Sequence, residues 1–290
     1  MEIQALQTFV AVAEAASVSR AAEALHLTQP AVSKRLAGLE TELGTPLFDR
    51  IGRRLALTEA GRTLLPNARR ILQELEESRR LIANLSQEVR GPLSLATSHH
   101  IGLHRLPPVL RRYTRDHPQV ELDLRFMDSE AACAAVEHGD LELAVVTLPS
   151  APAPVLDTGL VWDDPLVVVT GLNHPLAGRG RVALRELAAY PAILPAVGTY
   201  TREIIAGAVA ATGTTLNVNL ETNYMETIKM MVSIGLGWSA LPRTMLGPEL
   251  RELHVEELRL VRQLGTVRHR ERTLSNAAQA FIETLAAHPD

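Results

Sequence analysis

Apolar residues in the first 45 positions recur at helical spacing, in short blocks separated by polar turns. A first helix is marked by Ile3, Leu6, Phe9, Val10 and Ala13. Ser17 or Ser19 can cap a second helix over 20–25, and Thr28 can cap a third over 29–43. The turn between these two helices is short, and small residues at Ala21 and Ala22 let the helices approach closely. This pattern predicts a helix-turn-helix.

A different pattern, from about 58 to 88, predicts one long helix. Apolar and small residues repeat there in alternating steps of four and three, with charged residues between them, as in a coiled coil. We therefore expect the helix to pair two chains; the alternative is a helix packed on its own globule. The predicted dimerisation residues are Leu64, Ala68, Ile71, Leu75 and Ile82.

After Gly91-Pro92, short apolar strands alternate with helical segments. We expect strands at 93–97, 120–126, 142–147, 166–170, 192–194, 216–221 and 237–240, and helices at 103–115, 129–138, 201–212, 225–234 and 274–287. Such alternation predicts an α/β fold with mostly parallel sheets covered by helices. About 200 residues with this many strands indicate two lobes, and ligands in such folds bind beyond the carboxyl ends of the strands.

Composition limits the partners and the cellular location. The 290-residue chain has a formal net charge of -4, so any DNA binding must rely on a local basic face. The only cysteine, Cys133, lies in the helical segment AACAAV; we interpret it as a structural thiol, with a redox sensor as the alternative. With no signal-peptide pattern and no long apolar stretch, we expect a cytoplasmic protein without a membrane partner.

The start of the third helix has the side chains that read DNA bases. Gln29 can bond an adenine edge, Pro30 and Ala31 can touch a thymine methyl, and Ser33 and Lys34 suit phosphates and base edges. A basic cluster follows between two short apolar segments and indicates a hairpin wing, with a solvated turn as the alternative. The predicted DNA-binding residues are Ser19, Arg20, Thr28, Gln29, Pro30, Ala31, Ser33, Lys34, Arg35, Arg50, Arg53 and Arg54.

These residues resemble the LysR-type transcriptional regulators. The resemblance runs through LQTFVAVAEAASVSRAAEALHLTQPAVSKRLAGLETELGTPLFDR and LTEAGRTLLPNARRIL, then through GPLSLATSH, LPPVLRRYTRDHP, LELAVVT, HPLA and VSIGLGWSALP. It implies a winged helix-turn-helix over 1–57, a linker and dimerisation helix over 58–88, and an effector-binding domain over 91–290. That domain would resemble periplasmic binding proteins, with two Rossmann-like subdomains: 91–160 plus 265–290, and 161–264.

The resemblance also implies an effector cleft between the two subdomains. By motif position, its residues would be Thr97, Ser98, His99, His100, Ser129, Thr147, Thr199 and Thr201. These hydroxyl and imidazole groups follow strands and precede helices, where an anion is favoured. We therefore expect a small carboxylate or other anion as effector.

Three histidines, at 99, 100 and 104, depart from the Ser and Thr that are more frequent in relatives. His100 and His104 are four residues apart, a spacing that a metal site can use, but no third ligand is evident and we predict no metal. Contact with an anion and structural packing are the alternatives. A partly protonated His100 would strengthen carboxylate binding as the pH falls.

Two other function classes compete with a regulator. An enzyme could use Asp163 and Asp164, but the chain contains no GxSxG, GxxxxGK[ST], HExxH or GxGxxG phrase. A solute-binding protein for transport would fit two lobes but not the first 90 residues. We therefore predict a non-enzymatic transcription regulator without a cofactor beyond a small-molecule co-inducer. Its expected partners are double-stranded promoter DNA, the effector, further copies of itself as a homodimer or homotetramer, and RNA polymerase.

Overall fold

The computed structural model describes residues 1–51, 54–86 and 88–288, with the backbone alone at positions 50, 51 and 54. Contacts divide the chain into two units, Met1–Ser86 and Gln87–Asp290.

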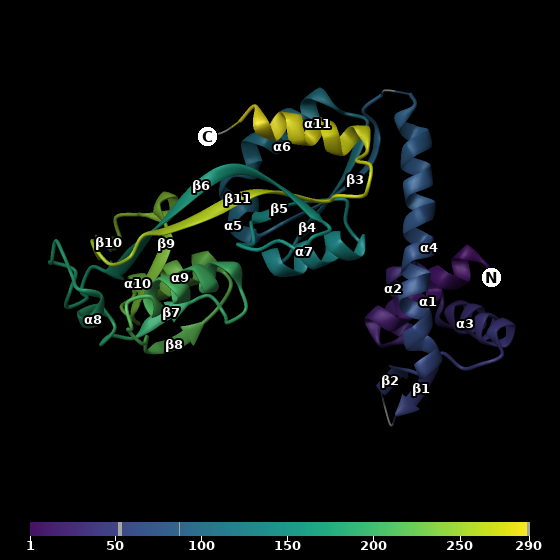
Figure 1. Ribbon diagram of the computed structural model, residues 1–290, viewed down its shortest axis with the longest axis horizontal. Helices are drawn as coiled ribbons and strands as arrows, with labels where there is room; N and C mark the ends of the chain where they lie inside the picture. Colours follow the sequence, from purple (N-terminus) through teal and green to yellow (C-terminus); the bar gives the residue numbers. More distant parts are fainter. Residues whose placement is uncertain (52–53, 87, 289–290) are drawn as a thin grey trace. The chain divides into compact units, whose positions relative to one another are not determined.

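The first unit begins with three short helices, followed by a hairpin and a long helix (Figure 1). The elements are α1 (Ile3–Ala15), α2 (Val18–Ala24), α3 (Gln29–Leu43), β1 (Phe48–Ile51), β2 (Arg54–Leu57) and α4 (Glu59–Asn84). Side chains cap α2 and α3 as the sequence predicts: the Ser17 hydroxyl accepts a hydrogen bond from the amide of Arg20, and the Thr28 hydroxyl accepts one from the amide of Ala31. Pro30 lies in the first turn of α3, where its missing N–H is tolerated.

The core of this unit holds α2 and α3 against α1 and the start of α4. Its buried residues include Phe9, Ala21 and Val32. Ala68 of α4 is also fully buried in this core, so it cannot contact a second chain as we predicted. The physical reason is that the first turns of α4 cover the helical globule, and only the later turns leave their apolar residues exposed.

The hairpin β1–β2 pairs antiparallel strands from Phe48↔Leu57 to Ile51↔Arg54, which gives the backbone of the predicted wing. Of the three predicted basic residues, Arg53 lies outside the described residues, and so do the side chains of Arg50 and Arg54.

The second unit contains one mixed sheet of nine strands among the described residues. The strands are β3 (Gly91–Thr97), β4 (Val120–Phe126), β5 (Leu143–Thr147), β6 (Leu156–Gly171), β7 (Ala192–Leu194), β8 (Val218–Glu221), β9 (Trp238–Pro242), β10 (Leu250–Leu253) and β11 (Leu260–His269). Their order is β4-β3-β5-β11-β6-β9-β7-β8, with β10 paired to β6. The covering helices are α5 (His99–His104), α6 (Leu106–Asp116), α7 (Ser129–His138), α8 (Leu184–Leu187), α9 (Tyr200–Ala210), α10 (Met225–Ser233), a 3-10 turn η1 (Arg243–Met245) and α11 (Asn276–Ala286).

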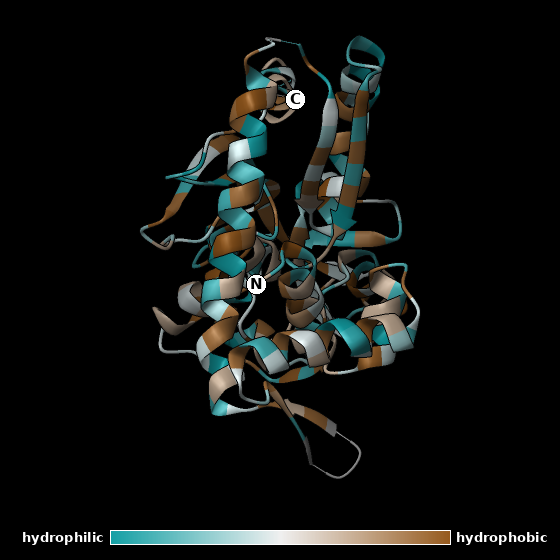
Figure 2. Cartoon of the chain, turned by 90° about the vertical axis from the view of Figure 1, so that its right-hand side faces the viewer, coloured by the Kyte–Doolittle hydropathy of each residue, from teal (hydrophilic) through white to brown (hydrophobic). Residues whose placement is uncertain are grey.

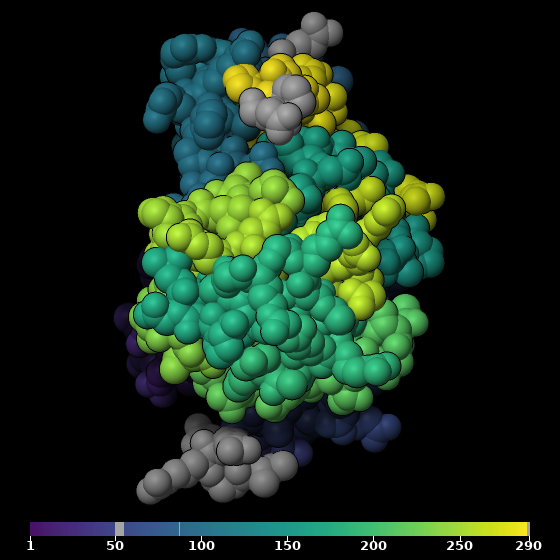
Figure 3. Space-filling model, turned by 90° about the vertical axis from the view of Figure 1, so that its left-hand side faces the viewer, coloured from purple at the N-terminus to yellow at the C-terminus, as the bar shows by residue number. Residues whose placement is uncertain are grey.

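Two lobes share this sheet because β6 and β11 run through both of them (Figure 1). Strand β6 contributes Trp162 to the core of the first lobe and Leu166 to the core of the second. Strand β11 does the same with Leu264 and Leu260. The first lobe contains β3–β5, α5–α7 and α11, and the second contains β7–β10 and α8–α10. Residues around α8 and β10 cover the outward face of the second lobe (Figure 3).

Three details correct the expectations from sequence. The sheet is not mostly parallel, because β6, β10 and β11 pair antiparallel with their neighbours. The strand expected at 166–170 extends over Leu156–Gly171, and β10 and β11 were not predicted. The single helix expected at 103–115 is two helices, since α6 must begin afresh where Pro107 and Pro108 lack amide donors.

Candidate functional site

One face of α3 packs in the core of the first unit, and the opposite face is exposed. Val32, Leu36 and Leu39 are buried, whereas Gln29 and Lys34 are exposed. A helix that reads a DNA groove needs this division, because its outer face must be free to enter the groove.

The predicted DNA-binding residues of α2 and α3 lie on or beside this exposed surface. Ala31 and Arg35 are half-buried, and the exposed ones are Ser19, Arg20, Thr28, Gln29, Pro30, Ser33 and Lys34. The Ser19 hydroxyl donates a hydrogen bond to Oε1 of Gln29 at 3.4 Å, which links the two helices at this surface. The Arg20 guanidinium donates to the carbonyl of Ala15, so in this structure it also ties α2 to the end of α1.

A second candidate site is a pocket between the lobes of the second unit. It is lined by seven of the eight predicted effector residues: Ser98, His99, His100, Ser129, Thr147, Thr199 and Thr201. The eighth, Thr97, is buried below it, where its hydroxyl donates to the carbonyl of Val145 at 2.8 Å. The pocket has a volume of about 40 Å³, enough for only a few water-sized groups.

Three helices begin at this pocket. Ser98 is the N-cap residue of α5, Ser129 is the first residue of α7, and Thr199 caps α9 by accepting a hydrogen bond from the amide of Arg202. The positive ends of these helix dipoles therefore lie at the pocket, two from the first lobe and one from the second. The Ser129 hydroxyl also accepts a hydrogen bond from the amide of Thr147 and so fixes the end of β5.

The pocket also contains a buried cation that the sequence analysis did not identify. Arg262 on β11 is only 2% exposed and lines the pocket. Its guanidinium contacts Oδ2 of Asp164 at 2.5 Å and donates to the Thr201 hydroxyl at 3.2 Å. Arg105 approaches the same carboxylate at 3.3 Å. Asp164 thus pairs with two guanidinium groups, and the carboxylates of Asp128 and Glu130 also line the pocket.

His100 is neutral in this environment. It is 5% exposed, and burial lowers its pKa to about 3, with the positive charge of Arg262 acting in the same direction. The low pKa of His100 argues against the expectation that a partly protonated His100 attracts the anion. Arg262 is a positive group that lines the pocket; burial lowers the pKa of its guanidinium, and the paired Asp164 carboxylate acts in the opposite direction.

A larger and mainly apolar cavity adjoins the polar pocket. It has a volume of about 300 Å³ and shares His99, His100 and Met225 with the polar pocket. The His99 ring stacks on Phe126 with centroids 5.4 Å apart and lies 4.9 Å from the ring of Tyr224. Together, the two spaces offer a polar end and an aromatic end.

Polar contacts hold the two lobes together around these cavities. Asn223 donates to Oδ2 of Asp128 at 2.7 Å, and the amide of Tyr200 donates to the carboxylate of Glu130. A ligand that alters these contacts would change the arrangement of the lobes.

Comparisons with known protein families identify the class of protein that combines these helices with a two-lobed domain. Residues 3–62 match the model "Bacterial regulatory helix-turn-helix protein, lysR family", and residues 86–290 match "LysR substrate binding domain". The chain belongs to the LysR family of transcriptional regulators.

Individual relatives agree with this assignment. The chain is 34% identical to the HTH-type transcriptional regulator YeiE of Escherichia coli (strain K12), over 97% of this chain and 96% of the relative. The structure resembles that of CbnR complexed with its target DNA, with a TM-score of 0.67, 22% identity and coverage of 99% and 100% of the two chains. The second unit resembles the effector-binding domain of QuiR in complex with shikimate, with a TM-score of 0.63, 19% identity and coverage of 69% and 97%.

Membership of the LysR family settles two expectations. The chain is a DNA-binding transcription regulator with an effector-binding domain, and it is not an enzyme. In the part of the chain that the structure describes, no helix has the length and apolar character needed to cross a membrane.

The only cysteine of this LysR-family chain is buried in α7. Burial raises the pKa of the Cys133 thiol to about 11, so the reactive thiolate is scarce near neutral pH. This environment favours the structural interpretation of Cys133 over a redox sensor.

Proposed function

We propose that this LysR-family regulator responds to a small organic anion that binds between the two lobes of its second unit. The observation that carries the proposal is the convergence of three helix N-termini and Arg262 on one pocket lined by hydroxyl groups. The acid group would occupy this pocket, and an apolar body would extend into the cavity beside Phe126 and Tyr224.

On DNA, we propose that α3 enters the major groove and that the hairpin β1–β2 contacts the backbone or the minor groove. Two chains would pair through the later turns of α4, and two such dimers would form a tetramer on a pseudo-palindromic operator. RNA polymerase is the proposed downstream partner, and the cytoplasm, where the chromosome lies, is the proposed location.

The effector changes regulation, in this proposal, through the arrangement of the lobes. The polar pocket of about 40 Å³ is smaller than an ordinary metabolite, so binding requires the lobes to separate or the ligand to use the apolar cavity as well. An anion can shift the lobes only by the difference between its affinities for the two arrangements.

The test is Ser98→Ala. The Ser98 hydroxyl is half-buried at the pocket and is expected to donate to the anion, so its loss should weaken anion binding by about 1.4 kcal/mol, roughly tenfold. A thermal-shift screen of small carboxylates on the wild-type protein selects the probe, and calorimetry then compares the variants. DNA retention in a mobility assay should be unchanged.

Ser94→Ala is the matched control, because Ser94 lies on the same strand but bonds Asp123 outside the pocket. Equal affinities for the selected carboxylate in Ser98→Ala and Ser94→Ala would place the anion elsewhere.

A further inference from the structure

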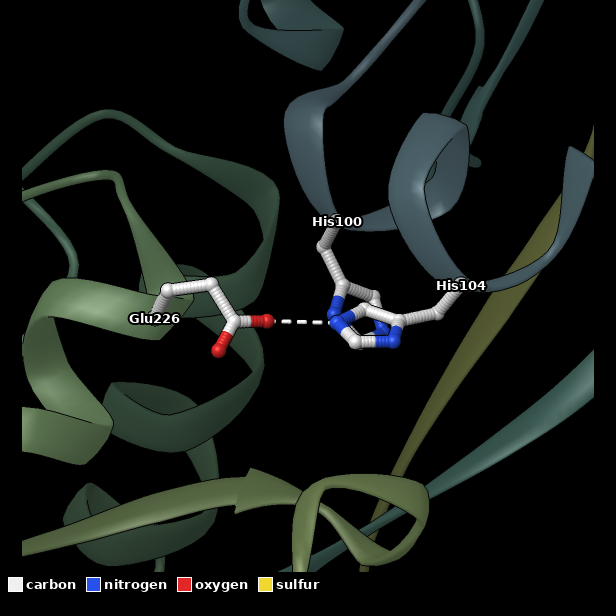
Figure 4. Close-up of side chains that lie close together, drawn as sticks. All are labelled: His100, His104 and Glu226. Atoms are coloured by element: carbon white, nitrogen blue, oxygen red, sulfur yellow. Dashed lines mark hydrogen bonds and ion pairs between the residues drawn. The ribbon is translucent and has the colours of Figure 1, made fainter. Parts of the chain in front are cut away.

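Three potential metal ligands meet at the junction of the lobes. His100 and His104 are four residues apart and present their rings on one side of α5, while Glu226 approaches from α10 of the second lobe (Figure 4). One ligand atom of each residue lies within 4.8 Å of the ligand atoms of the other two. Nε2 of His104 already contacts Oε1 of Glu226 at 2.5 Å. The sequence could not indicate Glu226, which is 122 residues from His104.

His100 is the second observation that points to a ligand. It is 95% buried, and neither ring nitrogen has a hydrogen-bond partner in the described part of the chain. Buried polar groups are normally paired, because leaving them unpaired is unfavourable. Its ring centroid lies 4.9 Å from that of His104. A neutral imidazole with a free lone pair is the form that binds metals.

We propose that His100, His104 and Glu226 bind one divalent first-row transition-metal cation of the Zn²⁺ type. Two imidazole nitrogens and one carboxylate oxygen suit such borderline cations, whereas Mg²⁺ and Ca²⁺ prefer oxygen ligands alone. His100 and Glu226 also line the 300 Å³ cavity, so a fourth coordination position is open to water or to a solute there. This inference goes beyond the proposed anion response and does not depend on it.

Binding requires small movements of the ligands. Metal–ligand distances of about 2.0–2.2 Å put neighbouring ligand atoms roughly 3.3 Å apart. The contact between His104 and Glu226 must therefore widen, and His100 must approach them. His104 and Glu226 are partly exposed, with side-chain exposures of 34% and 48%, so their side chains have room to move.

The surrounding charges moderate the affinity. Arg262 and Arg105 repel a cation, and Asp164, which pairs with both, attracts one. We therefore expect a dissociation constant on the order of micromolar. Since α5 and α10 belong to different lobes, the metal stabilises the arrangement in which the lobes are together.

The experiment titrates Zn²⁺ into the metal-free full-length protein by calorimetry, without DNA or an anion. We expect one cation per chain, and Glu226→Gln and His104→Gln should each weaken binding roughly tenfold or more. Glu226→Gln keeps the size of the side chain and can keep its hydrogen bond. His138→Gln, at an exposed position at the end of α7, is the control and should bind as the wild type does.

Co²⁺ provides an independent readout of the ligands. Bound to the wild-type protein, it should give visible absorption bands that are lost in Glu226→Gln and kept in His138→Gln. Absence of Zn²⁺ binding to the wild type would overturn the proposal, and so would equal affinities of the wild type and Glu226→Gln. Neither result bears on the anion response, which Ser98→Ala tests separately.

Discussion

An exposed glutamine begins α3, the helix that we propose to read DNA bases. Gln29 is the first residue of α3, and the hydroxyl of Ser19 donates to its Oε1, which restrains the side chain at the exposed surface. A glutamine amide can both donate to and accept from the edge of an adenine in the major groove.

We expect Gln29→Ala to weaken binding to the specific operator by about 1–3 kcal/mol, because one bidentate base contact is lost. A mobility assay on operators with each base pair changed in turn should show that the variant loses discrimination at one position. Gln7→Ala, an exposed glutamine on α1, serves as the control and should keep the wild-type preference. A uniform loss on every sequence would show that Gln29 does not read a base.

The sequence could predict those site residues whose role is marked by their neighbours in the chain. The hydroxyls of Ser98, Ser129 and Thr199 sit where a strand ends and a helix begins, a boundary that the local pattern marks. Arg262 comes from a strand that was not recognised, and its partner Asp164 is 98 residues away. The neutral state of His100 depends on burial and on that distant arginine, which no local pattern shows.

At the scale of elements, α4 has two parts with different surroundings. Its first turns pack on the helical globule through Ala68. Its later turns expose Leu81, Ile82 and Leu85, which are 50%, 70% and 82% accessible, and Figure 2 shows apolar positions alternating with polar ones along the helix. The heptad pattern predicted the helix. It could not show which apolar residues of α4 are covered by the first three helices of the same chain.

We expect Ile82→Lys to weaken dimerisation by roughly 3 kcal/mol, about a hundredfold in the dissociation constant. Ile82 is exposed in the single chain, and the proposed dimer would bury it on each side of a symmetric pair, where the variant places a charge instead. Sedimentation velocity over a dilution series measures the change. The neighbouring Ala83→Lys adds the same charge at an exposed position outside the seam, and it should remain dimeric. If the two variants dissociate alike, the dimer uses another surface.

The strands show where sequence patterns fail at this scale. The parallel strands β3, β4 and β7 were predicted, because each belongs to one lobe. Strand β6 was predicted only in its last part, because its burial changes from alternating to continuous as it passes from one core to the other. Strand β11 also crosses both cores, and no single periodicity describes it.

At the scale of the whole molecule, the proposed dimer makes a prediction about the symmetry of its operator. If two chains pair through α4, as we propose, they present two copies of α3 related by a twofold axis, so their site should be a pseudo-palindrome. Both copies can enter the major groove on the same side of the duplex only if the half-sites are separated by about one helical turn or a multiple of it.

Changing the half-site spacing therefore tests the dimer and the recognition helix together. Inserting about 5 base pairs between the half-sites rotates one of them to the opposite side of the duplex, and we expect the affinity to fall toward that of a single half-site. Inserting about 10 base pairs returns both half-sites to the same side of the duplex and should recover part of the affinity. The rest of the affinity stays lost because the two α3 helices of one dimer must then span a longer distance. A mobility assay on the three operators measures this, and a scrambled half-site of unchanged spacing gives the single-site reference. Equal affinities for all three spacings would mean that each chain binds its half-site independently, and the proposed pairing through α4 would then have no role on DNA.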